Sequence, residues 1–147
     1  MSVGAAILHP MDVVKDLALT DSLCAREFPA ARDGADPALG GPGYFLVVLG
    51  AAGGGTAADL YAHEAALIER FEERWGEASR WGSVTLLERA ARGEEIPEPW
   101  AELGVRADDL RTWHEPGTGR WVGIAVADRD PEADPELLLM VTDRDPP

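Results

Sequence analysis

The chain has 147 residues, 46% of them hydrophobic and 27% charged, and its formal net charge at neutral pH is −14. This length suits one domain with its own hydrophobic core, and this composition argues against a disordered chain. A surface this negative repels phosphate backbones and anionic lipids, so we expect neither direct nucleic-acid binding nor membrane binding. It favours a basic protein partner instead, although solubility and adaptation to a salty cytoplasm also select acidic surfaces.

Cysteine content and apolar runs indicate a cytoplasmic protein. Cys24 is the single cysteine and cannot form an intramolecular disulfide, which favours a reducing compartment. Residues 1–14 contain no lysine or arginine, so no secretory signal is expected. The longest apolar run, from Tyr44 to Ala52, is far shorter than the roughly 20 residues that a membrane-spanning helix needs.

The first forty residues predict little regular structure. Residues 3–8 form a candidate short strand, and Pro10 precedes apolar residues with helical spacing, which predicts a helix through Leu17. Residues 29–43 are rich in proline, glycine, alanine and aspartate, a composition typical of a long surface loop.

A strand, a glycine loop and a helix are predicted next. Residues 44–49 are continuously apolar, which predicts a central strand covered on both faces. After residues 50–55, an amphipathic helix is expected to begin at Thr56 and to end at Gly76. Its apolar stripe consists of Leu60, Leu67, Ile68, Phe71 and Trp75.

The segment that follows is harder to interpret. Residues 83–91 fit either a helix that begins at Ser83 or the start of a strand. Residues 94–104 contain two prolines and predict an irregular connection, anchored by Trp100 and Leu103.

The C-terminal third predicts an antiparallel meander, because three apolar runs alternate with turn-forming residues. The expected strands are residues 110–114, 120–127 and 136–142. We therefore expect a single α+β domain over residues 1–147. Its mostly antiparallel sheet combines the strand near 44–49 with the meander near 110–142, and one or two helices pack on one face.

The glycine loop and two histidines suggest a small enzyme or ligand-binding domain as the alternative function. Backbone amides of Gly53, Gly54 and Gly55 before a helix can hold phosphate, but the lysine of a P-loop is missing. His63 begins an H-E-x-x-H pattern whose second histidine is absent, and its place on the apolar stripe predicts a hydrogen-bonded structural histidine. His114 precedes a glutamate and can act as a general base only if the two side chains meet.

No metal, cofactor or catalytic residue is assigned from the sequence. Carboxylates alternate in the turn before the last strand, but the glycine and glutamate of an EF-hand loop are missing, so we expect a solvated acidic turn. A nucleophile elbow of the G-x-S-x-G type is absent as well. The carboxylates of this turn are Asp128, Asp130, Glu132 and Asp134.

The main functional hypothesis is therefore a non-catalytic, acidic protein-binding module. Such a module docks onto or neutralises a basic protein partner, as an immunity protein, an antitoxin or an adaptor does. Tryptophans outside the expected helix and strands can anchor such an interface, or can pin loops onto the core. The candidate partner-binding residues are Glu94, Glu95, Glu98, Trp100, Asp108, Asp109 and Trp113.

Overall fold

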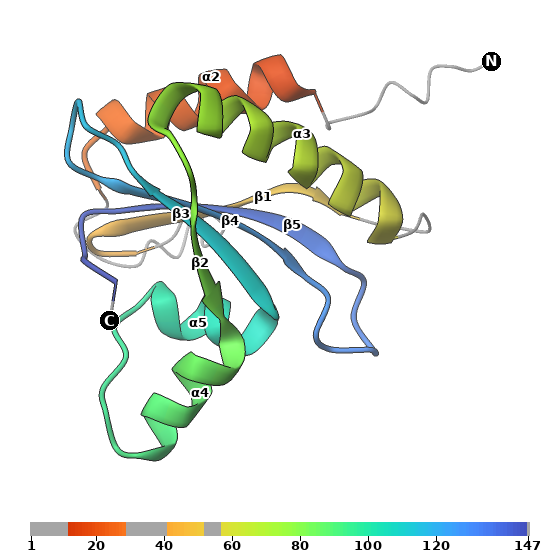
Figure 1. Ribbon diagram of the computed structural model, residues 1–147, viewed down its shortest axis with the longest axis vertical. Helices are drawn as coiled ribbons and strands as arrows, with labels where there is room; N and C mark the ends of the chain where they lie inside the picture. The colour runs from red at the N-terminus through yellow and green to blue at the C-terminus, as the bar shows by residue number, and fades with distance from the viewer. Residues whose placement is uncertain (1–11, 29–40, 52–56, 147) are drawn as a thin grey trace.

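A computed structural model describes residues 12–28, 41–51 and 57–146. Several sequence-based expectations lie outside these residues: the strand at 3–8, most of the loop at 29–43, the glycines at 53–55 and the helix start at Thr56. The described residues form an α+β fold with one five-stranded antiparallel sheet, as predicted. Helices cover both faces of this sheet (Figure 1).

The sheet joins one early strand to the C-terminal meander. The strands are β1 (Tyr44–Ala51), β2 (Ser79–Gly82), β3 (Asp109–His114), β4 (Trp121–Ala127) and β5 (Glu136–Thr142). Their order is β1-β5-β4-β3-β2, and every neighbouring pair is antiparallel. The continuously apolar β1 is therefore an edge strand and not a central one. Its register with β5 shifts between Val48 and Gly50, and Val48 is 41% exposed.

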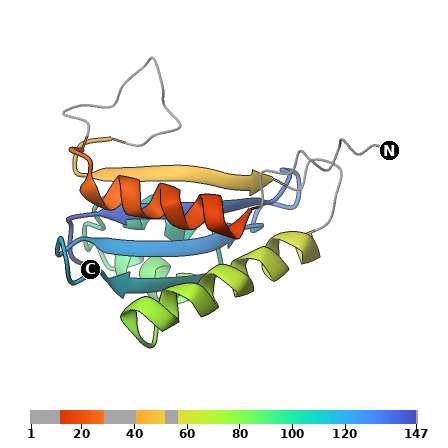
Figure 2. The same ribbon diagram turned by 90° about the horizontal axis from the view of Figure 1, so that it is seen from above.

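Two helices, α2 (Val13–Ala25) and α3 (Ala57–Trp75), lie side by side on one face of the sheet (Figure 2). Asp12 caps α2, since its carboxylate accepts hydrogen bonds from the backbone amides of Val14 and Lys15. Gly76 ends α3 with a positive φ of 90°, a conformation that glycine adopts without strain. The predicted stripe of α3 packs on the sheet in the larger of two apolar cores.

Two shorter helices, α4 (Ser83–Ala91) and α5 (Trp100–Arg106), pack below the sheet in the view of Figure 1. The ambiguous segment 83–91 is thus a helix, and the expected irregular connection contains one. Trp100 and Leu103 anchor α5 as predicted, with 0% and 1% of their surfaces exposed. They form the second core with apolar residues from the lower face of β3, β4 and β5.

The two hairpin tryptophans lie on opposite faces of the sheet. Trp113 pairs with Val122, and Trp121 pairs with His114, so the two rings are offset by one residue. Because a shift of one residue reverses the face of a strand, Trp113 belongs to the upper core and Trp121 packs against the lower one. Trp81 lies in the edge strand β2 and packs against the lower core.

The lower core should depend strongly on Trp100. Replacing Trp100 with alanine leaves a cavity between α5 and the sheet, and we expect a loss of about 3–5 kcal/mol in the free energy of unfolding. Val105 lies on the same helix but is 62% exposed, so Val105→Ala should change stability by no more than about 0.5 kcal/mol. Urea denaturation of the two variants measures both values, and equal effects would show that α5 does not close a core.

Candidate functional site

A groove runs along the outer side of α5. It consists of two hollows of about 470 and 420 Å³ that share Val105 and Arg106. The larger hollow lies between α5 and the β4–β5 turn, and the smaller one extends toward the start of β1 at Tyr44. We call these two hollows together the α5 groove.

The lining of the α5 groove is strongly acidic. Arg106 is the one basic residue among the described residues that line it, and its guanidinium pairs with Glu102 at 3.4 Å and with Glu136. Five carboxylates line it: those of Glu98, Glu102, Asp130, Asp134 and Glu136. A single guanidinium cannot neutralise five carboxylates, so the groove carries a net negative charge that attracts cations.

A third, apolar hollow of about 90 Å³ adjoins the groove between α4 and α5. Val105 lines this hollow as well, together with Leu87 and Ile96. The two helices approach closely at Gly104, where a Cβ atom would lie 3.1 Å from Cδ1 of Leu86. We call this hollow the α4–α5 pocket.

Arg144 fixes the start of α5. Its guanidinium donates to the carbonyl oxygens of Glu98 at 2.7 Å and Pro42 at 2.9 Å, which ties the entry of α5 to the chain before β1. The indole of Trp100 donates in turn to the carbonyl oxygen of Arg144. The position of Glu98 is therefore set by the last residues of the chain.

Arg129 fixes the other end of the groove. Its guanidinium donates to the carbonyl oxygen of Gly104 at 3.0 Å, and its backbone amide donates to that of Arg106 at 3.3 Å. These bonds hold the β4–β5 turn against the end of α5. The acidic turn thereby becomes one wall of the groove.

The predicted partner-binding carboxylates are distributed over this side of the molecule and do not form one cluster. Glu98 lines the groove, whereas Glu94 and Glu95 lie exposed beyond the end of α4. Hydrogen bonds from Arg92 and Arg89 lower the pKa of Glu94. Asp108 and Asp109 follow α5 and pair with Arg129 and Arg80, respectively.

Trp100 and Trp113 are not available to a partner in this structure. They are 0% and 2% exposed, in the lower and the upper core respectively. Trp100 was expected in a loop, and its place on the inner side of a helix explains its burial. Trp113 donates a hydrogen bond to the carbonyl oxygen of Gly76, which ties β3 to the end of α3.

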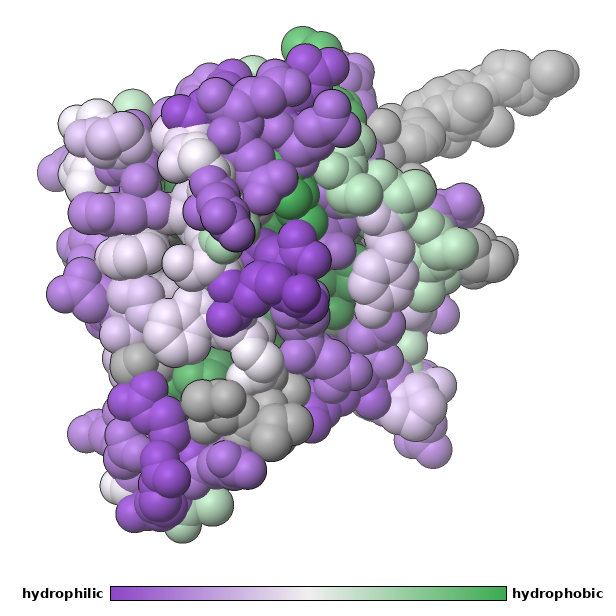
Figure 3. All heavy atoms as spheres, viewed as in Figure 1, coloured by the Kyte–Doolittle hydropathy of each residue, from purple (hydrophilic) through white to green (hydrophobic). Residues whose placement is uncertain are grey.

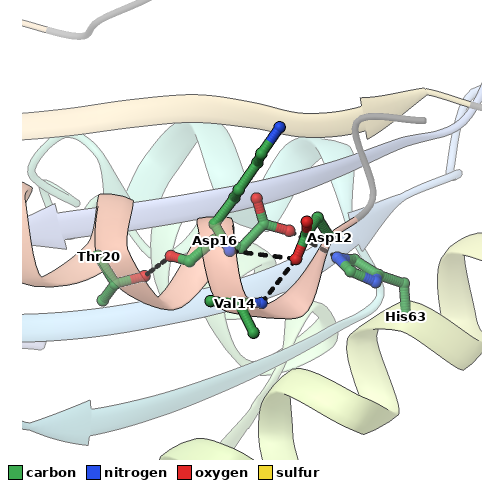
Figure 4. Close-up of polar contacts among 6 residues, drawn as sticks. Asp12, Val14, Asp16, Thr20 and His63 are labelled. Atoms are coloured by element: carbon green, nitrogen blue, oxygen red, sulfur yellow. Dashed lines mark hydrogen bonds and ion pairs between the residues drawn. The ribbon is translucent and has the colours of Figure 1, made fainter. Parts of the chain in front are cut away.

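His63 is a buried structural histidine, as its place on the apolar stripe predicts. Its Nε2 atom lies 2.6 Å from Oδ2 of Asp16, and both side chains are 8% exposed. Figure 4 shows this contact between α3 and the first turns of α2. Burial raises the pKa of the Asp16 carboxyl, and the hydrogen bond with His63 opposes that rise.

His114 lies far from His63. It ends β3, stacks on Trp121 at a centroid distance of 4.6 Å, and its Nε2 atom lies 3.0 Å from the carbonyl oxygen of Gly119. Tyr61, two residues before His63, instead contacts Asp128 at the opposite end of β4. The seven residues of β4 span about 20 Å, so the structure does not bring the two histidines together. The third element of the alternative site, Gly53–Gly55, lies outside the described residues.

A second acidic cluster lies where α3 begins. The hydroxyl of Tyr61 donates to Asp128, and the half-buried Glu64 lies near Asp109 and Asp128. Burial raises the pKa of Glu64 to about 7, with Arg111 opposing the rise and the two aspartates adding to it. Among the described residues, no group of three or more histidine, cysteine, aspartate or glutamate side chains is arranged to hold a metal ion.

Sequence reasoning missed Glu102, Val105 and Glu136 as parts of a common surface. The sequence does contain a sign of the helix α5, because Trp100, Leu103 and Ala107 recur at the spacing of one helical face, and all three are buried. The helix that this spacing indicates places Val105 on the opposite, outer side. Only the tertiary structure brings Glu136 to Arg106.

Comparison with protein-family models, with curated proteins and with solved structures finds no match for this chain. In the described ranges, no helix combines the length and the apolar character needed to cross a bilayer. Figure 3 shows hydrophilic residues over most of one face, with hydrophobic areas between them and a pale green area where α3 begins. A function must therefore be argued from the geometry and charge of the chain itself.

His63 should contribute to stability. His63→Ala leaves the Asp16 carboxylate buried without its partner, so we expect a loss of about 3 kcal/mol in the free energy of unfolding at neutral pH. His114 is exposed, and His114→Ala should cost no more than about 1 kcal/mol, the value of its contact with Trp121. Urea titrations followed by tryptophan fluorescence measure both, and an unchanged midpoint for His63→Ala would contradict the structural role.

Glu64 should make stability fall as pH rises. Its pKa rises from 4.5 in the unfolded chain to about 7 in the folded protein, so the folded state holds the proton more tightly. The resulting stabilisation is complete below pH 4.5 and is lost as the pH passes through 7. Glu64→Gln lacks this dependence.

We therefore expect Glu64→Gln to gain stability over the unsubstituted protein between pH 4.5 and 8. The gain should be about 1–2 kcal/mol once solvent screening is allowed for. Unfolding free energies at pH 4.5, 6 and 8 test this, with the exposed Glu69→Gln on the same helix as control. A difference that does not change with pH would refute the assignment.

Proposed function

We propose that this protein is a non-catalytic binding module that docks onto or neutralises a basic protein partner through the α5 groove. An inhibitor of the immunity or antitoxin type, or an adaptor, has this mode of action. The observation that carries the proposal is the groove lining, in which five carboxylates face one arginine. Opposite charges of this kind accelerate association and select partners.

The chain segments that form this side are acidic over their whole length. Residues 94–109 and 128–136 together hold eleven aspartates and glutamates but only two arginines, Arg106 and Arg129. Both arginines are engaged within the protein, one with Glu102 and Glu136 and the other with backbone carbonyls of α5. Arginines outside these segments pair with Glu94 and Asp109, and the carboxylates of both segments still outnumber the arginines that pair with them.

Val105 adds an apolar element to this acidic surface. Stable protein interfaces combine an apolar centre with a polar rim, and exposed Val105 lies where the three hollows meet. A surface serving only solubility has no need of an exposed apolar side chain inside an acidic groove. This combination favours recognition of a protein over a general solubilising role.

The alternative function, a small enzyme or ligand-binding domain, has less support. It requires His63 or His114 to converge with the glycine loop, and His63 is occupied by Asp16. His114 lies at the other end of the sheet, beside Trp121. No described contact favours this alternative.

The proposed function is tested with two variants that each lose four negative charges. The groove variant combines Glu98→Gln, Glu102→Gln, Asp130→Asn and Asp134→Asn. The control combines Glu69→Gln, Glu72→Gln, Glu73→Gln and Glu77→Gln, all exposed on or directly after α3 on the other face of the sheet. Each tagged protein captures partners from the native cell's lysate at low and at high salt.

We expect a basic protein, retained in stoichiometric amount at low salt, to bind the unsubstituted protein and the α3 control but not the groove variant. High salt should release it, because the Debye length shrinks from about 10 Å at 0.1 M to about 3 Å at 1 M. Two outcomes contradict the proposal: no such protein is retained, or both variants retain it equally.

A further inference from the structure

The α5 groove contains two kinds of recognition element a short distance apart. Val105 is 62% exposed and Leu87 is 38% exposed, and both line the α4–α5 pocket. Single exposed apolar residues are common, but these two border one shared hollow. Two carboxylates line the adjoining smaller hollow. Glu102 belongs to α5, and Glu98 lies directly before this helix.

The spacing along α5 places these elements in a row. Ala101 and Val105 are four residues apart in α5, so they lie along one side of the helix, and Glu98 and Glu102 line the same hollow as this pair. Ala101 and Val105 line both the groove and the α4–α5 pocket. Apolar side chains therefore lie beside carboxylates in the smaller hollow, and the carboxylates of the β4–β5 turn line the larger one.

Resting on the proposed function, we infer that the α5 groove binds a basic segment of the partner in which arginine or lysine residues flank one aliphatic residue. The aliphatic side chain enters the α4–α5 pocket against Val105 and Leu87. The flanking cations lie among the carboxylates of Glu98 and Glu102 on one side and of Asp130 and Asp134 on the other. An interface of this kind gains affinity from the apolar anchor and partner selection from the charges.

The charge of the groove selects this occupant over others. An acidic segment is repelled, and a purely apolar segment buries carboxylates of the groove without supplying any cation to them. A polyamine satisfies the carboxylates but leaves the α4–α5 pocket empty. Only a segment with both kinds of side chain uses both parts of the surface.

The test uses two synthetic peptides of equal charge and the complete protein. One peptide has the sequence Arg-Arg-Leu-Arg-Arg, and the other has serine in place of leucine. Binding is followed at low salt by backbone amide shifts in two-dimensional NMR spectra of the ¹⁵N-labelled protein. We expect the leucine peptide to bind about fivefold more tightly than the serine peptide, the effect of burying part of one aliphatic side chain. The largest shifts should fall on α5 and the end of α4.

Val105→Ser should remove this preference, so that both peptides bind with the affinity of the serine peptide. The matched control is Val14→Ser, since Val14 is a 75% exposed valine on α2, on the other face of the sheet. It should leave the preference unchanged. Far-ultraviolet circular dichroism of both variants verifies that they fold.

Four results overturn the inference. Three come from the peptides: no binding of the leucine peptide, equal affinities for the two peptides, or a preference that survives Val105→Ser. Spermine serves as a further probe, and displacement of the leucine peptide by an equal concentration of spermine means that the groove recognises charge alone. Because capture of a basic protein by the charge variants is a separate readout, any of these results can occur while the proposed function stands.

Discussion

The double-sided burial of β4 and β5 is the constraint on which the rest of the structure depends. Residues 137–141 of β5 are at most 1% exposed, and their side chains alternate between the two cores. A strand that is apolar on both faces must be covered on both, or its side chains remain in water. The helices α2 and α3 cover one face, and in the part of the chain that the structure describes α4 and α5 cover the other. The position of α5, and with it the groove on its outer side, follows from the composition of the central strands.

Arginine side chains connect these layers through hydrogen bonds to main-chain oxygens. Arg120 donates to the carbonyl oxygen of Leu23, Arg129 to that of Gly104, and Arg144 to those of Glu98 and Pro42. The planar guanidinium suits this role because it offers several donors in a fixed geometry. Cations that bind main-chain oxygens inside the fold are less available on its surface. The carboxylates, in contrast, are mostly exposed. The surface is therefore more negative than the numbers of acidic and basic residues alone would indicate.

Local patterns in the sequence predicted the α+β class, α3 and the three C-terminal strands. The apolar stripe of α3 and the turn residues between the strands are signals that act over a few residues, and such signals survive without tertiary information. The order of the strands depends on contacts between distant residues, and β1 shows the difference. Its continuous apolar run indicates burial. Because the strand packs in the same core as α2, its side chains are buried on that face even at the edge of the sheet.

The candidate site was only partly predictable for the same reason. The acidic character of residues 94–109 is evident from the sequence, and Glu98, a predicted partner-binding residue, lines the groove. The sequence predicts Trp100 both as an anchor of this connection and as a partner-binding candidate, because the prolines around it conceal the short helix whose inner side it occupies. The contribution of the β4–β5 turn depends on Arg129 reaching Gly104, a contact that no local pattern encodes.

The path of the chain through α4 and α5 has a consequence for how such a protein diversifies. Gly82 and Asp109 are paired neighbours in β2 and β3, so residues 83–108 form one long excursion that leaves the sheet and returns beside its starting point. An excursion with adjacent ends can change in sequence and in length while the strands that bear it keep their register. Only its inward side chains, such as Trp100 and Leu103, are bound by the packing of the core. The outer side of residues 83–108 can therefore change its charge and shape while the five-stranded sheet stays the same.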